Sequence, residues 1–169
     1  MNKFIVLALT GYFGLMLLGF AGLAGHWHAT GLPPVQPIAF SHQLHLNTVG
    51  LNCTHCHQYA DQGKQATVPA MSICMACHKN VKTDSPEIQK LSQAWEGGEG
   101  VEWVKVHDLP WHVHFTHKRH IKAGIECQSC HGEVQAMEQM RQVRSLEMGW
   151  CVSCHRLNAA PTDCLTCHK

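Results

Sequence analysis

The sequence predicts short helices and irregular coil wrapped around groups that are not protein, preceded by one N-terminal transmembrane helix. Three observations of the 169-residue chain predict this fold class. All ten cysteines occur in pairs of the form Cys-x-x-Cys-His, an uncharged segment lies near the N-terminus, and the remainder is poor in apolar residues. Outside residues 4–25, apolar residues other than cysteine make up about a third of the chain, which is marginal for a self-sufficient core.

The segment from Phe4 to Gly25 contains 22 residues without a charge and follows Lys3. At helical rise, 22 residues span roughly 33 Å, enough to cross the core of a bilayer. Lys3 on the short side predicts that the chain after residue 28 lies outside, in the periplasm of a bacterial inner membrane. A signal peptide cleaved near Gly22-Leu23-Ala24 is the alternative. We therefore expect a membrane anchor over residues 1–28, with its helix over about residues 4–25.

The five Cys-x-x-Cys-His motifs are typical of c-type haem attachment. Two thiols three positions apart reach the vinyl groups of a porphyrin, and the histidine after them gives one axial nitrogen to the iron. The cysteines are Cys53, Cys56, Cys74, Cys77, Cys127, Cys130, Cys151, Cys154, Cys164 and Cys167. The proximal histidines are His57, His78, His131, His155 and His168. We therefore predict five covalently bound haem c groups, which would form the interior that the side chains lack.

Other uses of paired cysteines fit less well. A disulfide framework needs no histidine after every second cysteine. Structural zinc takes four ligands from two such pairs, and five pairs do not divide by two. A thioredoxin-like site has one motif on a βαβ frame, and no such pattern is visible. A net charge of +1 without a basic stripe also argues against a nucleic-acid partner.

Two histidine pairs stand in matching frames before the first and third motifs. The frames are Phe40-Ser-His42-Gln-Leu-His45 and Phe115-Thr-His117-Lys-Arg-His120. Histidines at i and i+3 lie on one side of a helical turn, so each pair can provide the second axial ligands of two neighbouring haems. The repeat predicts one unit over residues 40–100 with two haems and another over residues 101–169 with three.

The fifth distal ligand stays open on the residues alone. His107, His112 and His114 are nearest in sequence to the remaining haem motif. Met148 competes with them, and a methionine would raise the potential of that haem relative to two histidines.

The other elements follow from local composition. Three prolines predict an extended linker over residues 29–39. Ser85-Pro86-Glu87 predicts a short helix over residues 84–91, and Gly97-Gly98 ends any continuation. Residues 133–146 form the strongest helix candidate, because they combine good helix formers with neither glycine nor proline.

The Phe-x-His-x-x-His frames resemble those of the multihaem class III cytochromes c of the cytochrome c3 and c7 kind. A further set of strings, including His107-Asp-Leu-Pro110 and Met148-Gly-Trp-Cys151, is similar to the pentahaem cytochrome subunit of alternative complex III, a bacterial quinol-oxidising respiratory complex. This resemblance covers about residues 40–168 and implies His107 as the fifth distal ligand. A related hexahaem subunit of periplasmic quinone reductase complexes shares similar strings, but it would need a sixth motif.

The resemblance implies an electron relay in a respiratory or photosynthetic chain. Electrons from a quinol-binding membrane subunit would pass through an iron–sulfur subunit and the haems to a periplasmic acceptor, such as a cytochrome c, a copper protein or an oxidase. The chain is then no enzyme on its own, because every iron has a candidate for both axial positions and none is open to substrate. A stand-alone membrane-anchored quinol dehydrogenase and a multihaem reductase subunit are the alternatives.

Overall fold

The computed structural model describes residues 2–30 and 32–168, with the backbone alone for residues 27–30. The chain divides into two compact units, Met1–Leu32 and Pro33–Lys169. The boundary lies inside the predicted linker, so residues 33–39 belong to the same unit as both predicted haem regions.

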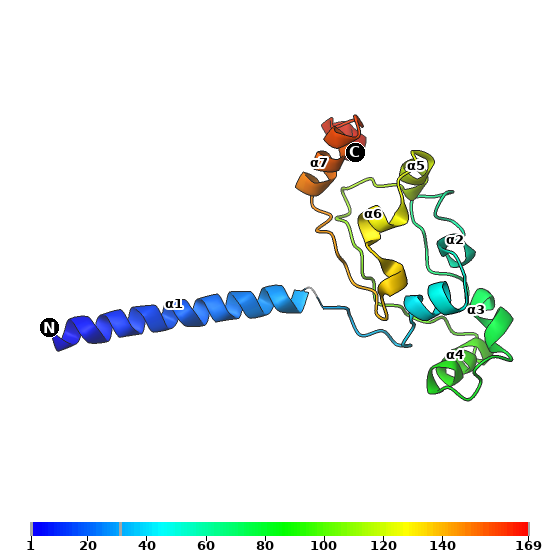
Figure 1. Ribbon diagram of the computed structural model, residues 1–169, viewed down its shortest axis with the longest axis horizontal. Coiled ribbons are helices and arrows are strands. Elements are labelled where there is room, and N and C mark those ends of the chain that lie inside the picture. The colour runs from blue at the N-terminus through cyan, green and yellow to red at the C-terminus, as the bar shows by residue number, and fades with distance from the viewer. Residues whose placement is uncertain (1, 31, 169) are drawn as a thin grey trace. The chain divides into compact units, whose positions relative to one another are not determined.

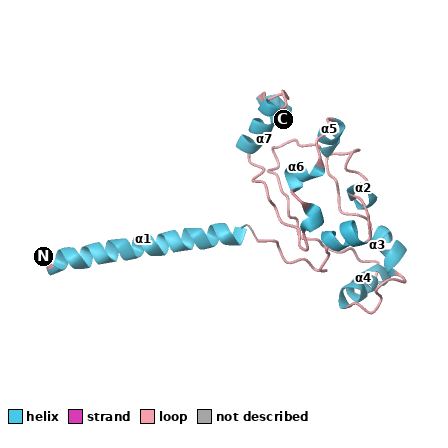
Figure 2. Cartoon of the chain, viewed as in Figure 1, coloured by secondary structure: helices cyan, strands magenta, loops and turns pink. Residues whose placement is uncertain are grey.

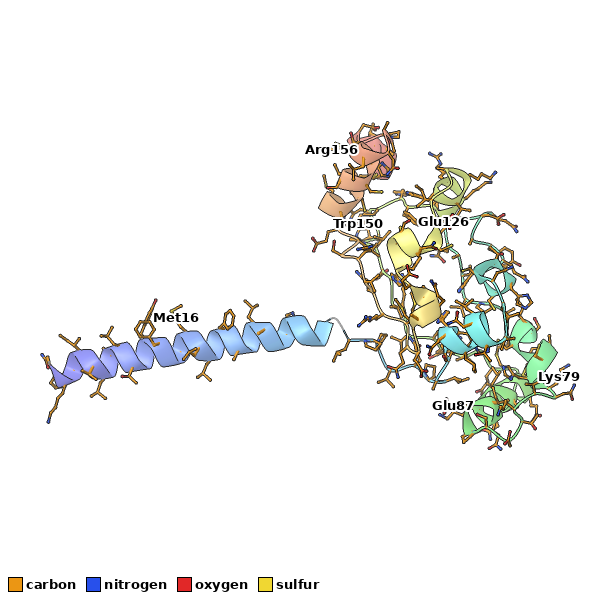
Figure 3. The ribbon with its side chains drawn as sticks, in the orientation of Figure 1. Met16, Lys79, Glu87, Glu126, Trp150 and Arg156 are labelled. Atoms are coloured by element: carbon orange, nitrogen blue, oxygen red, sulfur yellow. The ribbon has the colours of Figure 1, made fainter. Side chains whose placement is uncertain are left out.

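The first unit is the single helix α1 (Lys3–Thr30), whose apolar side chains stand out along it (Figure 3). No part of its most apolar stretch is buried, and Met16 is one of many exposed side chains there. Within the described residues, α1 is the one helix long and apolar enough to cross a membrane. Length and composition identify it as a candidate anchor, and a signal sequence would meet the same test.

The second unit consists of short helices joined by irregular coil (Figures 1 and 2). In chain order they are the π-helical turn η1 (Leu44–Thr48), α2 (Cys53–Cys56), α3 (Met71–His78), α4 (Pro86–Glu96), α5 (His117–Lys122), α6 (Cys127–His131), the 3-10 turn η2 (Val134–Ala136), α7 (Met148–Leu157) and α8 (Cys164–Cys167). Over residues 33–168 no strand forms, and one antiparallel bridge joins Val113 to His168. The predicted helix-and-coil architecture is confirmed for this part of the chain.

The side-chain core of this unit is small. Ile38, Met75 and Leu91 are less than 9% exposed and pack together, with Trp103 against them. No side chain in the described part of the chain is less than 2% exposed. The low apolar content of the sequence therefore agrees with the structure, in which the cluster around Ile38, Met75 and Leu91 is the hydrophobic core of the described residues.

The segment predicted as a linker is docked rather than free. The Gln36 side chain donates to the carbonyl oxygen of Val104 at 2.9 Å and accepts from its N–H at 2.8 Å. The N–H of Ala39 donates to the Glu87 carboxylate on α4 at 2.6 Å. Together with buried Ile38, these bonds fix residues 36–39 to the second unit.

One helix prediction is confirmed and another is wrong. The helix predicted over residues 84–91 is α4, which begins at Pro86 and ends before Gly97. The helix predicted over residues 133–146 forms only the short turn η2, and the remainder is coil. Propensities of a few tenths of a kcal/mol per residue are overridden there by tertiary bonds. The carbonyl of Met137 accepts from Gln43 N–H at 3.1 Å, and the carbonyl of Gln135 accepts from the Asn47 side chain at 2.7 Å.

The two predicted haem regions interlock. Besides the bonds between η1 and η2, the N–H groups of His117 and Lys118 donate to the carbonyls of Lys64 and Gly63, each at 3.1 Å. The first turn of α5 is therefore held by a loop of the first region. These bonds place residues 40–100 and 101–169 in one structure rather than in separate domains.

Candidate haem-binding site

All five Cys-x-x-Cys-His motifs lie on short helices, and each of these helices begins at the first cysteine of its motif or three residues before it. In α2, the Asn52 side chain caps the helix by accepting from His55 N–H at 2.8 Å. In α8, Asp163 does the same for Thr166 N–H at 3.0 Å. One helical turn brings residues i and i+3 to one face, so both thiols of a motif can reach the same macrocycle. The ten cysteines form no disulfides.

Four of the five proximal histidines share one orientation. Their Nδ1 atoms bond to backbone carbonyl oxygens, which leaves Nε2 free for a metal. The pairs are His57 with Thr67 at 2.5 Å, His78 with Val81 at 3.1 Å, His155 with Pro161 at 2.5 Å, and His168 with His112 at 3.3 Å. The fifth, His131, has its Nδ1 at 3.3 Å from Nε2 of His107 instead.

The predicted distal histidines His45, His117 and His120 are held in the same manner. Nδ1 of His45 bonds to the Ser41 carbonyl at 2.8 Å, and Nδ1 of His120 bonds to the Thr116 carbonyl at 2.9 Å. Nδ1 of His117 reaches the Lys64 carbonyl, also at 2.8 Å. Both kinds of predicted ligand therefore present Nε2.

Three predicted distal histidines face proximal ones across similar separations. Ring centroids are 6.1 Å apart for His45 and His78, 6.3 Å for His117 and His131, and 6.0 Å for His120 and His155. Two imidazoles that bind one metal from opposite sides, each through a nitrogen at about 2 Å, have centroids roughly 6 Å apart. The donors thus fit haem iron, and no group of three or more metal-binding side chains occurs among the described residues.

His42 lies near His57, and burial affects it more than the other predicted distal histidines. Burial, and then the neighbouring His57 and His45, lowers the pKa of His42 to about 4. Its Nδ1 is buried and has no hydrogen-bond partner. A buried imidazole that is neutral and lacks a partner at Nδ1 needs an explanation. Binding of a metal through its other ring nitrogen, Nε2, would provide one.

The candidates for the fifth distal position are separated in space. The His112 ring lies 5.6 Å from that of His168, with an angle of 26° between the planes. The His107 ring lies against His131 at 4.4 Å, nearly perpendicular, which is too close for a metal between them. Met148 begins α7 with 70% of its surface exposed, and the backbone of His114 bonds to the carbonyl of Cys167.

The motifs adjoin one another in a definite order. Burial raises the pKa of five thiols, and for four of them the second cause is a neighbouring cysteine of another motif. These neighbours are Cys74 with Cys56, Cys127 with Cys53, Cys130 with Cys154, and Cys151 with Cys167. The order in space is therefore second, first, third, fourth and fifth, and α3 and α7 lie toward opposite ends of the unit (Figure 1).

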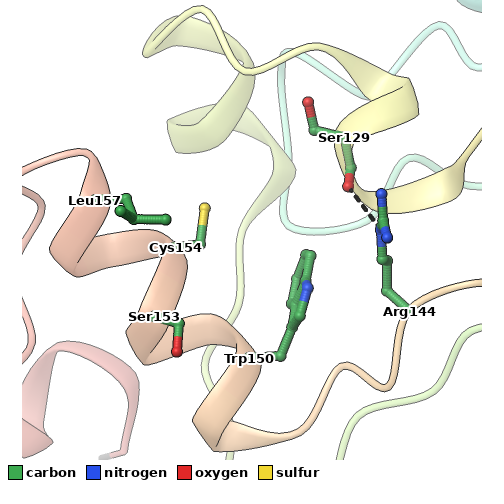
Figure 4. A pocket seen from close by; sticks show the side chains of 6 residues that line it. All are labelled: Ser129, Arg144, Trp150, Ser153, Cys154 and Leu157. Carbon is green, nitrogen blue, oxygen red and sulfur yellow. Dashed lines mark hydrogen bonds between the residues drawn. The ribbon is translucent and has the colours of Figure 1, made fainter.

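Sequence reasoning missed a cationic side chain between the third and fourth motifs. Arg144 donates from Nε to the Ser129 carbonyl at 3.3 Å and lies opposite Trp150 and Cys154 in a pocket (Figure 4). It also lies near enough to Cys130 to oppose the rise in the pKa of that thiol, which burial causes. A guanidinium there is suited to a carboxylate of a bound porphyrin. No local sequence signal marks Arg144, because it lies in the segment expected to be helical.

Comparison with known proteins identifies a family and a relative. Residues 38–94 and 113–169 each match the family described as cytochrome c7 and related cytochrome c. The second match begins 75 residues after the first, at 113 against 38, which is the offset between Phe40 and Phe115. The multiheme cytochrome c subunit of menaquinone reductase from Nitratidesulfovibrio vulgaris is 26% identical over 161 residues, covering 79% of this chain and 77% of the relative.

Proposed function

Because the chain belongs to the family of cytochrome c7 and related cytochromes c, we propose that it holds five c-type haems and relays electrons between a quinone-linked membrane complex and a periplasmic partner. Membership of the family implies covalently bound haem, and when bound the haem iron supplies reversible one-electron transfer. As predicted from the sequence, the chain is an electron-transfer protein rather than an enzyme by itself.

The observation that carries this proposal is the pairing of histidines. Each proximal histidine lies near a second histidine that precedes it by 14 or more residues, and three of the pairs have centroid separations of 6.0 to 6.3 Å. A reductase needs one iron with an open position, whereas paired histidines favour electron transfer without substrate binding. The contiguous order of the motifs supports a relay along the unit.

We assign His112, in place of His107, to the fifth distal position. Its ring stacks near that of His168, while His107 contacts a proximal histidine that already faces His117. The remaining assignments are His42 for His57, His45 for His78, His117 for His131 and His120 for His155. Replacing His112 with Ala is expected to convert one haem in five to a high-spin signal in the EPR spectrum, and His114→Ala is the matched control.

The partners in this proposal are those of an alternative complex III-like assembly: an iron–sulfur subunit and a quinol-binding membrane subunit. The candidate anchor α1 supports a place at the inner membrane with the second unit in the periplasm. The relative from N. vulgaris supports a quinone-linked complex, and its name favours a second candidate in which electrons flow toward the quinone. Quinol oxidation and quinone reduction are distinguished by experiment.

The test is purification of the full chain from its native membrane in mild detergent. The proposal predicts copurification with an iron–sulfur subunit and haem reduction when menaquinol is added. Haem oxidation by added menaquinone, with a reduced periplasmic cytochrome as donor and no reduction by menaquinol, would favour the second candidate. Isolation of the chain alone with unaided quinol oxidation would contradict the complex-subunit proposal and favour a stand-alone quinol dehydrogenase.

A further inference from the structure

His131 differs from the other four proximal histidines in what its Nδ1 contacts. Nδ1 of each of the other four lies 2.5 to 3.3 Å from a backbone carbonyl oxygen. Nδ1 of His131 lies 3.3 Å from Nε2 of the His107 side chain. Because Nε2 of a proximal histidine is the atom that reaches the iron, Nδ1 of His131 carries the hydrogen and donates it, and His107 accepts.

His107 cannot occupy the other side of the same iron. Its ring centroid lies 4.4 Å from that of His131 at an angle of 78°, the geometry of edge contact. His117 already faces His131 at 6.3 Å with the two rings within 8° of parallel. His107 therefore lies behind His131, on the side away from the predicted metal.

The loop around His107 fixes it in this place. Lys105 and Asp108 form an ion pair across it, and the Asp108 carboxylate accepts from Leu109 N–H at 3.0 Å. The ring of His107 is half-buried. Its Nε2 lies 3.3 Å from Nδ1 of His131 and can accept that hydrogen bond when the imidazole carries its own hydrogen on Nδ1.

We propose that His107 is a positioning residue for His131: it accepts the hydrogen bond from Nδ1 and thereby orients this ligand and sets the potential of the third haem apart from the others. This inference depends on the proposed function, since it presumes that His131 binds haem iron. An imidazole nitrogen is a more basic acceptor than an amide carbonyl, so it increases electron donation from His131 to the metal and favours the ferric form.

The equivalent position in the first motif provides the contrast. Nδ1 of His57 bonds to the Thr67 carbonyl, as in an ordinary proximal histidine. Two motifs that correspond in the repeat therefore give their irons ligands of different basicity. Substitution of His107 should move one potential and leave that of the first haem unchanged.

The experiment is a redox titration of the intact protein followed by optical and EPR spectra. His107→Ala is expected to raise one of the five potentials by up to about 59 mV, a tenfold change in a one-electron equilibrium. All haems should stay low-spin. His107→Gln, which can offer an amide carbonyl like those that the other proximal histidines contact, should reverse only part of this rise in potential. His114→Ala, an exposed histidine seven residues away, is the matched control.

Two results would overturn the inference. A high-spin haem in His107→Ala would make His107 an iron ligand, and a shift no larger than that of His114→Ala would remove its role. Haem content and ligation of the unsubstituted protein test the proposed function separately, because fewer than five low-spin haems there would contradict that function whatever His107 does.

Discussion

The two repeats have closely similar ring contacts in the frames that precede their first Cys-x-x-Cys-His motifs. Phe40 stacks on His45 at 4.4 Å and meets His42 edge-on at 4.9 Å. The second frame repeats this, with Phe115 at 4.6 Å from His120 and at 4.8 Å from His117. The second histidine of each frame bonds to the carbonyl four residues before it and faces the later motif across about 6 Å. The surroundings of His45 and His78 are therefore like those of His120 and His155.

The repeats differ where the first histidine of each frame meets its motif. His117 has a carbonyl partner at Nδ1, whereas Nδ1 of His42 is buried without one. His131 is followed by Gly132 and bonded to His107, whereas His57 bonds to a carbonyl. The repeats thus share the geometry of one histidine pair and differ in the surroundings of the other. Under the proposed function, haems at corresponding positions are expected to differ in potential.

The largest expected effect tests the pair that the repeats share. His45→Ala and His120→Ala each remove a proposed distal ligand that faces a proximal histidine, so each should convert one low-spin haem to high-spin. Because the two sites match in geometry, the two EPR spectra should show equal losses. A high-spin signal in one variant only would break the equivalence of the repeats at these positions.

A smaller effect is expected at Gly132, where the repeats differ. Its φ of 72° and ψ of −164° lie in a region that only glycine adopts readily, and a Cβ there would meet Val143 at 2.8 Å. Gly132→Ala should lower the free energy of unfolding by about 1–3 kcal/mol. Denaturant unfolding measures this. Gly149→Ala, inside α7 with no heavy atom within 4 Å, is the control and should be neutral or slightly stabilising.

A third comparison concerns the phenylalanines of the two frames. Leu in place of Phe40 or Phe115 keeps an apolar side chain but loses the ring contacts, at a cost of about 0.5–1.5 kcal/mol each. The contacts with the histidines correspond, but Phe40 also meets Trp103 edge-on at 6.5 Å, so Phe40→Leu is expected to give the larger loss in thermal unfolding. Tyr59→Leu, at a ring that is 57% exposed, should change stability less than either. A larger loss for Phe115→Leu than for Phe40→Leu would contradict this expectation.

The smallest effect is expected at Glu87, which the second repeat lacks. A hydrogen bond from Lys90, and then one from the Ala39 backbone, lowers the pKa of the exposed Glu87 carboxyl. A carboxyl whose pKa is lower in the folded than in the unfolded state stabilises the folded protein at pH values above its unfolded-state pKa. This stabilisation is lost as the pH falls through its folded-state pKa. Glu87→Gln should thus lower the denaturation midpoint slightly at neutral pH and not in acid. If Glu102→Gln changed the denaturation midpoint by the same amount, the hydrogen bonds of Glu87 would not explain the effect.

The parts of the site that depend on local sequence could be predicted. A Cys-x-x-Cys-His string brings its attachment and proximal groups together on one helical turn, and each Phe-x-His-x-x-His frame folds on itself in the same way. The family match confirms the cytochrome c assignment. The docking of residues 36–39 could not be predicted, because Val104 and Glu87 are distant in sequence.

Which proximal histidines His107 and His112 approach could not be predicted from the sequence for the same reason. Both lie between the two segments that match the family, residues 38–94 and 113–169, and their neighbours depend on how the C-terminal motif folds back. The bridge between Val113 and His168 brings His112 to the fifth motif. A single bridge leaves no periodic pattern in the sequence from which it could be predicted. The segment over residues 133–146 has helical propensity without a helical partner, so contacts with η1 determine its path.

The central claim is that two histidines hold each of five haem irons. The most direct test is the EPR spectrum of the oxidised full-length protein, combined with haem quantification by its pyridine haemochrome. The account predicts five haems per chain, all low-spin and all with two histidine ligands. A histidine–methionine signal, a high-spin haem, or fewer than five haems per chain would contradict it.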